Sequence, residues 1–139
     1  RASPLAKRAA GDKADRFSCV QMPLSITMPE AIQRPTQWLG EATVPAVAAA
    51  HILGLAVVGS GSIGQGKVPK MNESLVKWLG EELADDNQRA LQFSRSASGL
   101  TTALVGMKQP DHVAANLDVQ GRAPLSRAVF ELMFRKSPV

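Results

Sequence analysis

The sequence has few of the residue types that carry redox, metal or stacking chemistry. Its 139 residues include one cysteine, two histidines, two tryptophans, four phenylalanines and no tyrosine. A single cysteine excludes an internal disulfide, and the chain has no Cys/His cluster for a metal. Cys19 lies in the apolar alternation Phe17-Ser18-Cys19-Val20, which predicts a small buried hydrophobic side chain. This cysteine usage favours a reducing compartment, either the cytoplasm or an organelle matrix.

Long apolar runs are also missing, because glycines at 54, 59, 61 and 64 interrupt the longest one before it could span a bilayer.

The net charge of +4 is unevenly distributed along the chain. Residues 1–16 hold five basic and two acidic residues, a net of +3, which leaves +1 for the rest. With a nearly neutral body and few aromatics, a nucleic-acid partner is not expected. The basic start fits the remnant of a transit peptide or the end of a surface helix equally well, and Arg1 in place of Met predicts a processed product or a fragment.

The rest of the chain alternates strand and helix signals. Hydrophobic residues make up 45% and charged residues 20%, which predicts a globular domain, and the length fits one domain. Apolar runs bounded by Gly, Pro or Ser predict strands at Phe17–Leu24, Leu55–Val58 and Thr101–Val105. Helical spacing follows each strand, as in a parallel sheet covered by helices.

Helices are predicted at Thr36–Leu53, Asn72–Leu79, Asp85–Ser96, Gln109–Leu117 and Ser126–Lys136. In the first, Pro45 fits a first turn, so the continuous helix is expected from about Val44. In the third, Asp85 or Asp86 caps the start and Leu91 faces the sheet. The last places Val129, Phe130, Met133 and Phe134 on one stripe. Three parallel strands leave two unpaired edges and an open apolar inner face, so we expect part of a larger fold, roughly half of a barrel of about 250 residues.

Two segments have the composition of anion-binding loops. Gly59-Ser60-Gly61-Ser62-Ile63-Gly64-Gln65-Gly66-Lys67 follows a strand, and its amide groups can cup a phosphate. It matches neither a Walker motif nor a GxGxxG fingerprint, and a Gly/Ser-rich loop alone is more often a plain connector. The segment from Val105 to Asn116 places a glycine and Lys108 before a helix start, where barrels bind phosphate. Taken singly, a lysine such as Lys108 is more often a solvated surface residue than a ligand-binding one. A histidine such as His112 is more often an exposed helix residue than an acid or base.

With these residues the chain resembles the aldo/keto reductases over residues 17 to about 120. The resemblance rests on an ordered set of segments similar to strands six, seven and eight of that family, together with Ala90–Ser96 and the helix from Pro110 to Asn116. The strand segments are Val20-Gln21-Met22-Pro23-Leu24, Gly54-Leu55-Ala56-Val57-Val58 and Thr101-Thr102-Ala103-Leu104-Val105-Gly106-Met107.

The resemblance implies an α/β fold, the C-terminal portion of a (β/α)8 TIM barrel with three parallel strands and covering helices. The expected organisation is a basic N-terminal segment at 1–16, βα units at 17–120 and a C-terminal helix within 121–139. The family binds NADPH or NADH across the C-terminal ends of its strands and reduces carbonyls. The implied cofactor-binding residues are Gln21, Ser60, Ser62, Ile63, Gly64, Gln65, Gly66, Lys67, Gly106, Met107, Lys108, His112 and Asn116.

Within that set, the resemblance implies that Gln21 holds the nicotinamide carboxamide, the Ser62–Lys67 loop surrounds the pyrophosphate, and Asn116 bonds adenine. Gly106, Met107 and Lys108 fall where the family contacts the adenosine 2′-phosphate. Three positions depart from the family pattern. Ser60 replaces a stacking tyrosine, His112 an arginine and Ala115 an acidic residue.

The family's catalytic Asp, Tyr, Lys and His belong to strands two to four, upstream of Arg1, so no catalytic residue is assigned here. The isolated chain is therefore expected to be inactive. Three hypotheses follow: the cofactor-binding part of a reductase completed by an upstream half-barrel, a reductase-derived structural subunit whose edges other proteins cover, and an independent small-ligand module using the glycine loop.

Overall fold

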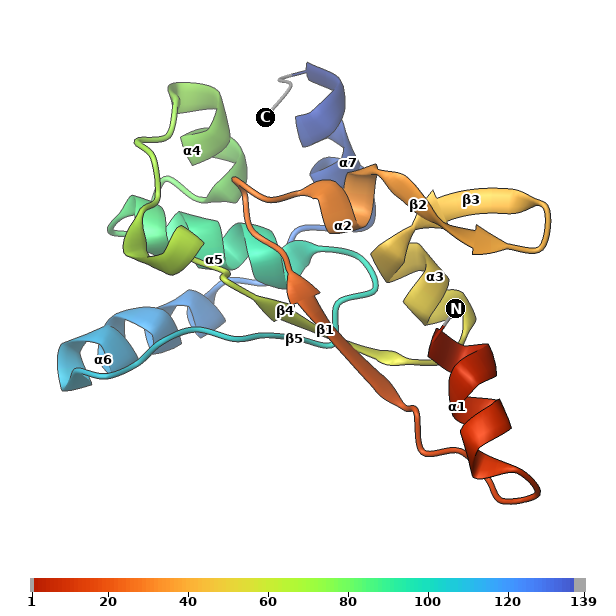
Figure 1. Ribbon diagram of the computed structural model, residues 1–139. Helices are drawn as coiled ribbons and strands as arrows, with labels where there is room; N and C mark the ends of the chain where they lie inside the picture. The colour runs from red at the N-terminus through yellow and green to blue at the C-terminus, as the bar shows by residue number, and fades with distance from the viewer. Residues whose placement is uncertain (1, 137–139) are drawn as a thin grey trace.

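The computed structural model describes residues 2–136, and its centre is a three-stranded parallel sheet in the order β1-β4-β5 (Figure 1). The strands are β1 at Cys19–Pro23, β4 at Ala56–Ser60 and β5 at Thr102–Ala103. The parallel register pairs Cys19 with Ala56 and Val58 with Thr102. The three predicted strands are thus confirmed, although β5 is shorter than its apolar run because only two of its residues pair with β4.

Most of the predicted helices are present, with boundaries shifted by a residue or so at either end. The helices are α1 (Ala2–Ala10), α2 (Glu30–Gln33), α3 (Ala46–Ile52), α4 (Glu73–Leu79), α5 (Asp86–Ser96), α6 (Pro110–Asp118) and α7 (Arg127–Lys136), with short 3-10 turns η1 (Gly64–Gly66) and η2 (Val119–Gly121). Of the two candidate caps for α5, Asp85 is the N-cap: its carboxylate accepts a 2.8 Å hydrogen bond from the Gln88 amide.

The predicted helix over Thr36–Leu53 is wrong in its first half. Residues 35–45 form an antiparallel hairpin, with β2 at Pro35–Leu39 and β3 at Ala42–Pro45, and only α3 is helical. Gly40 has φ +59°, and it is the first residue of the two-residue turn that joins Leu39 to Ala42. A glycine at this position suits the turns that match hairpin twist, and Thr43 and Val44 favour strand. Of the residues at helical spacing, Val47 and Ile52 therefore belong to a helix, whereas Val44 belongs to β3.

Helices cover one face of the parallel sheet and leave the other open. Val20 and Met22 of β1 pack with Val57 of β4 against Val47 and Ala50 of α3. Successive strand residues point to opposite faces, so Cys19 and its alternate neighbours lie on the other face. That face holds Cys19, Gln21, Pro23, Ala56, Val58, Ser60 and Thr102, all exposed or half-buried.

The prediction that Cys19 is buried is wrong, because its side chain is exposed on this open face. The alternation around Cys19 does form a strand, but the face that helices cover is the one occupied by Val20 and Met22. Nothing within residues 2–136 covers the opposite face of β1. The expected open inner face is therefore a feature of the structure.

The largest core cluster lies between the ends of β1 and β4 and the helices α4, α5 and α7. It contains the buried residues Leu24, Ile26, Met71, Leu79, Ala90, Phe93, Ala97, Phe130 and Met133. Ser94 fixes α5 against the strand ends, because its buried hydroxyl lies 3.3 Å from the Leu24 carbonyl and 3.1 Å from the Ser62 carbonyl. The position of α5 therefore also positions the loop that follows β4.

The C-terminal helix α7 packs mainly as its pattern predicts. Phe130 and Met133 are buried and Phe134 is half-buried, whereas Val129 is 37% exposed and lies outside the packed stripe. Val129 is therefore the one member of the predicted stripe that does not face the core. The last three residues of the expected C-terminal segment, 137–139, lie outside the described residues.

Candidate functional site

The loops after β4 and β5 meet at the C-terminal edge of the parallel sheet and line one groove. The groove has a volume of about 420 Å³, and its walls are Gly61, Ser62, Ile63, Gln65, Gly66, Leu104, Val105 and Gly106. The two loops are held together because the Leu104 amide donates a 2.8 Å hydrogen bond to the Gly59 carbonyl. The two segments that the sequence singled out are thus neighbours in space.

The glycine loop after β4 is a compact turn that uses part of its own hydrogen-bonding capacity. Gly64, Gln65 and Gly66 all have positive φ, at +55°, +58° and +77°. The amides of Gly64, Gly66 and Lys67 donate to carbonyls within the same loop at 2.8–3.1 Å. Fewer amides are therefore available to an anion than a fully open loop would offer, and those of Ser62, Ile63 and Gln65 remain as candidates.

Ser62 is the most unusual side chain of this groove. It is 1% exposed, and its hydroxyl has no hydrogen-bond partner among the described residues. Buried polar groups nearly always have a partner, so an unpaired one in a groove wall calls for an explanation such as a bound ligand or water. The Ser62 carbonyl, by contrast, accepts from Ser94 and fixes the residue against α5.

A second groove runs along β5 and adjoins the first, since Val105 lines both. It has a volume of about 620 Å³ and includes Met107 at the end of the strand segment and Asn116 on α6. These are two of the positions that the resemblance implies for the adenosine end of a nucleotide. Lys67, Lys108 and His112 are exposed and line neither groove.

Gln21 and Ser60 lie on the open face of the sheet, on adjacent strands. Gln21 pairs with Val58, and Ser60, two residues further along β4, pairs with Pro23. The Gln21 and Ser60 side chains therefore lie on the same face, diagonally across the two strands. The structure therefore brings most of the implied residues to one end and one face of the sheet. The exposed lysines and His112 are the exception, because no contact within the described residues directs them toward either groove.

Three residues that line the first groove lie outside the set implied by the resemblance. Gly61, Leu104 and Val105 contribute to its walls but were not among the implied binding residues. Gly61 belongs to the glycine run, and its φ of +67° is the kind of backbone that the run predicts. Leu104 and Val105 look like ordinary strand residues, and although Val105 begins the second candidate segment, its apolar side chain is not itself a signal for binding.

Each outer strand of the parallel sheet has one neighbour within the described residues, as expected for part of a barrel. Beside β1 lies a largely apolar groove of about 530 Å³, and several of its walls are exposed. Trp38 on β2 is 74% exposed and Leu53 is 47% exposed. Exposed apolar residues gathered at an unpaired strand edge are typical of surfaces that another polypeptide covers.

Two absences hold for the part of the chain that the structure describes. No helix in residues 2–136 is both long and apolar enough to cross a membrane. Among the same residues, no group of three or more His, Cys, Asp and Glu side chains could hold a metal ion.

Comparison with known proteins supports the fold at low sequence identity. No protein-family model and no curated protein matches the sequence. Among solved structures, the holo form of aldo-keto reductase AKR11C1 from Bacillus halodurans matches with a TM-score of 0.53 and 19% identity, over 93% of this chain and 46% of that one. Its apo form matches with a TM-score of 0.54 and 19% identity, over 94% and 46%. The chain thus spans about half the length of these structures. It has the fold of the C-terminal part of an aldo-keto reductase barrel.

Proposed function

We propose that this chain is the cofactor-binding C-terminal part of an NAD(P)H-dependent reductase. The observation that carries the proposal is the groove shared by the Gly61–Gly66 loop and the Leu104–Gly106 segment at the C-terminal ends of parallel strands. In α/β folds with parallel strands, ligands bind at this end of the sheet. Within a reductase, the nicotinamide cofactor supplies the hydride.

The residues fit the pyrophosphate end of such a cofactor best. The glycine loop allows close backbone approach, and the unpaired hydroxyl of Ser62, which is buried in this structure, can donate to a phosphate oxygen once it turns toward the groove. Gln21 is assigned to the carboxamide of the nicotinamide, Asn116 to adenine and Lys108 to the 2′-phosphate. The Lys108 assignment requires that its exposed side chain turn toward the second groove.

A matched pair of lysine substitutions tests the phosphate assignment. Lys108→Ala is expected to weaken NADPH binding about tenfold, because one charge-assisted phosphate contact is lost, and to leave NADH binding unchanged. Nicotinamide fluorescence of the 139-residue chain would follow both titrations. Lys13→Ala removes another exposed lysine outside both grooves and serves as the control. Equal weakening of NADPH and NADH by Lys108→Ala would remove the 2′-phosphate from the assignment.

We also propose that hydride transfer requires an upstream half-barrel. The chain contains no tyrosine to act as the general acid of this family, and no residue replaces it by motif. An upstream half would pair with the free edge of β1 and cover the groove that holds Trp38 and Leu53. The 139-residue chain alone is therefore assigned no turnover. Its single cysteine supports a reducing compartment.

The second candidate is a reductase-derived structural subunit. The exposed apolar residues beside β1 favour it, because they suit any protein that covers this edge. Native mass measurement separates the candidates. One stoichiometric upstream reductase half supports the split enzyme, whereas stable association with proteins of other folds, together with no NADPH binding, supports the structural subunit.

A further inference from the structure

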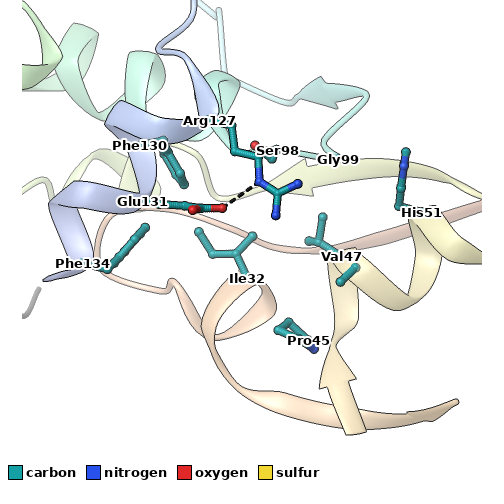
Figure 2. A pocket seen from close by; sticks show the side chains of 11 residues that line it. Ile32, Pro45, Val47, His51, Ser98, Gly99, Arg127, Phe130, Glu131 and Phe134 are labelled. Atoms are coloured by element: carbon teal, nitrogen blue, oxygen red, sulfur yellow. Dashed lines mark hydrogen bonds and ion pairs between the residues drawn. The ribbon is translucent and has the colours of Figure 1, made fainter. Parts of the chain in front are cut away.

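A pocket on the helix-covered side of the molecule lies apart from both candidate cofactor grooves. It has a volume of about 400 Å³, within the range of small-molecule sites. Figure 2 shows side chains from α7 facing residues of α2 and α3 across it, with Ser98 and Gly99 at one margin. The polar and charged members of its lining are His51, Ser98, Arg127 and Glu131, and most of the remaining lining is apolar. None of the lining residues belongs to β1 or β5, the outer strands of the parallel sheet.

Most of the wall is apolar and comes from distant parts of the chain. Ile32 and Val47 lie opposite Phe130 and Phe134 of α7 (Figure 2). The two phenylalanine rings are 5.4 Å apart at 72°, an edge-to-face arrangement that fixes their orientation. An apolar group in this pocket would therefore meet apolar side chains from both walls.

Arg127 brings a positively charged group to the apolar space. Its Nε donates to the Glu131 carboxylate at 2.7 Å, which orients the guanidinium over the pocket (Figure 2). Neither Nη atom has a hydrogen-bond partner within residues 2–136. A guanidinium has five N–H donors in a fixed fork, and this one uses a single donor. The four remaining donors suit a carboxylate, which can accept two of them in parallel.

The Arg127–Glu131 pair is charged on both sides and is open to solvent. The hydrogen bond from Arg127 and its positive charge lower the pKa of the Glu131 carboxyl, so Glu131 stays ionised at neutral pH. Glu131 is therefore satisfied by Arg127 and has less capacity to hold a ligand cation. The group left with unused donors is the guanidinium.

We propose that this pocket binds a small aromatic monocarboxylate, with its ring between α3 and α7 and its carboxylate on the Nη groups of Arg127. The proposal does not rest on cofactor binding, because the pocket shares no lining residue with the grooves at the strand ends. A single carboxylate matches one guanidinium, since the other charged side chain of the lining, Glu131, is an anion that would repel a second carboxylate.

Three probes of nearly the same shape test this proposal on the 139-residue chain by calorimetry. Phenylacetate is expected to bind with a Kd of about 1 mM, typical for a ligand of ten heavy atoms. Phenylacetamide and 2-phenylethylammonium are expected to bind at least about tenfold more weakly, because neither can accept a bidentate charged pair from Arg127. Equal binding of the amide, preference for the ammonium or no binding of phenylacetate would each overturn the proposal.

Substitutions of the ion pair give an independent readout. Arg127→Gln should weaken phenylacetate binding about tenfold, whereas Glu131→Gln should strengthen it severalfold by removing a negative charge beside the ligand. Both side chains are largely exposed, so the variants are expected to fold, and circular dichroism would verify this. Arg8→Gln removes the same charge on α1 and is the control with unchanged binding. Unchanged affinity in Arg127→Gln would also overturn the proposal.

Discussion

Replacing Phe93 with alanine is expected to lower the free energy of unfolding by about 3–5 kcal/mol, the usual cost of removing a buried phenylalanine. Phe93 is fully buried on α5, and its ring lies 5.0 Å from that of Phe130 and 6.0 Å from that of Phe134. The substitution leaves a cavity between α5 and α7 and removes two ring contacts. Because domains of this size have total stabilities of about 5–15 kcal/mol, a large part of the variant should be unfolded in mild urea.

Phe134→Ala is the matched control for this prediction. Phe134 belongs to the same ring cluster but is half-buried, so its loss removes less apolar contact and opens less enclosed volume. Urea denaturation followed by circular dichroism should show a clearly smaller shift for Phe134→Ala than for Phe93→Ala. Equal shifts in the two variants would mean that α5 is not packed into the core as described.

The second large effect is expected at Arg89, which ties α5 to the segment that follows α4. Its Nε donates to the Gly80 carbonyl at 3.0 Å, one Nη to the Leu83 carbonyl and the other to Asp86 at 3.0 Å. The side chain is only 11% exposed. Arg89→Ala leaves two carbonyls and a carboxylate without this donor, and the expected loss is about 3 kcal/mol.

Arg89→Lys distinguishes the charge of Arg89 from its geometry. A lysine can pair with Asp86, but its single ammonium cannot also donate to both carbonyls, so about half of the loss in free energy of unfolding is expected. Lys77→Ala removes an exposed i,i+4 partner of Glu73 and should change the free energy of unfolding by no more than about 0.5 kcal/mol. If Arg89→Ala behaves like Lys77→Ala in urea denaturation, the Arg89 contacts do not hold α4 and α5 together.

The sequence predicted the parallel sheet well because its signal is local. Each strand of the parallel sheet is a short apolar run, and several helix starts have a recognisable cap or proline, such as Asp85 before α5 and Pro110 at the start of α6. The hairpin at residues 35–45 was missed because Val44, Val47 and Ile52 continue at helical spacing, and this pattern hid the turn at Gly40. The turn glycine between strand-forming residues was the signal that could have identified it.

Burial of Cys19 could not be predicted from its neighbours. The alternation of residues 17–20 defines two faces, but which face is covered depends on where α3 packs, and that is a long-range property. The candidate cofactor groove is likewise only partly predictable from the sequence. Its glycine loop was visible in the sequence, whereas Leu104 and Val105 became lining residues only because the two loops meet.

The pairing of Arg127 with Glu131 is visible as an i,i+4 spacing, but the pocket beside it is not. Its opposite wall comes from Ile32 and Val47, some eighty or more residues earlier in the chain. Contacts over such sequence separations depend on the whole fold, so no local pattern contains them.

Amide chemical shifts of the 139-residue chain during titration with NADPH would show whether and where this half of the barrel binds the cofactor, since a 14.8 kDa chain suits residue-resolved spectra. Saturable shifts are expected at the loop after β4, at the segment after β5 and near Asn116, with Ser62 among the largest. Shifts confined to other surfaces, or none at millimolar NADPH, would contradict the proposal that this half of the barrel holds the cofactor.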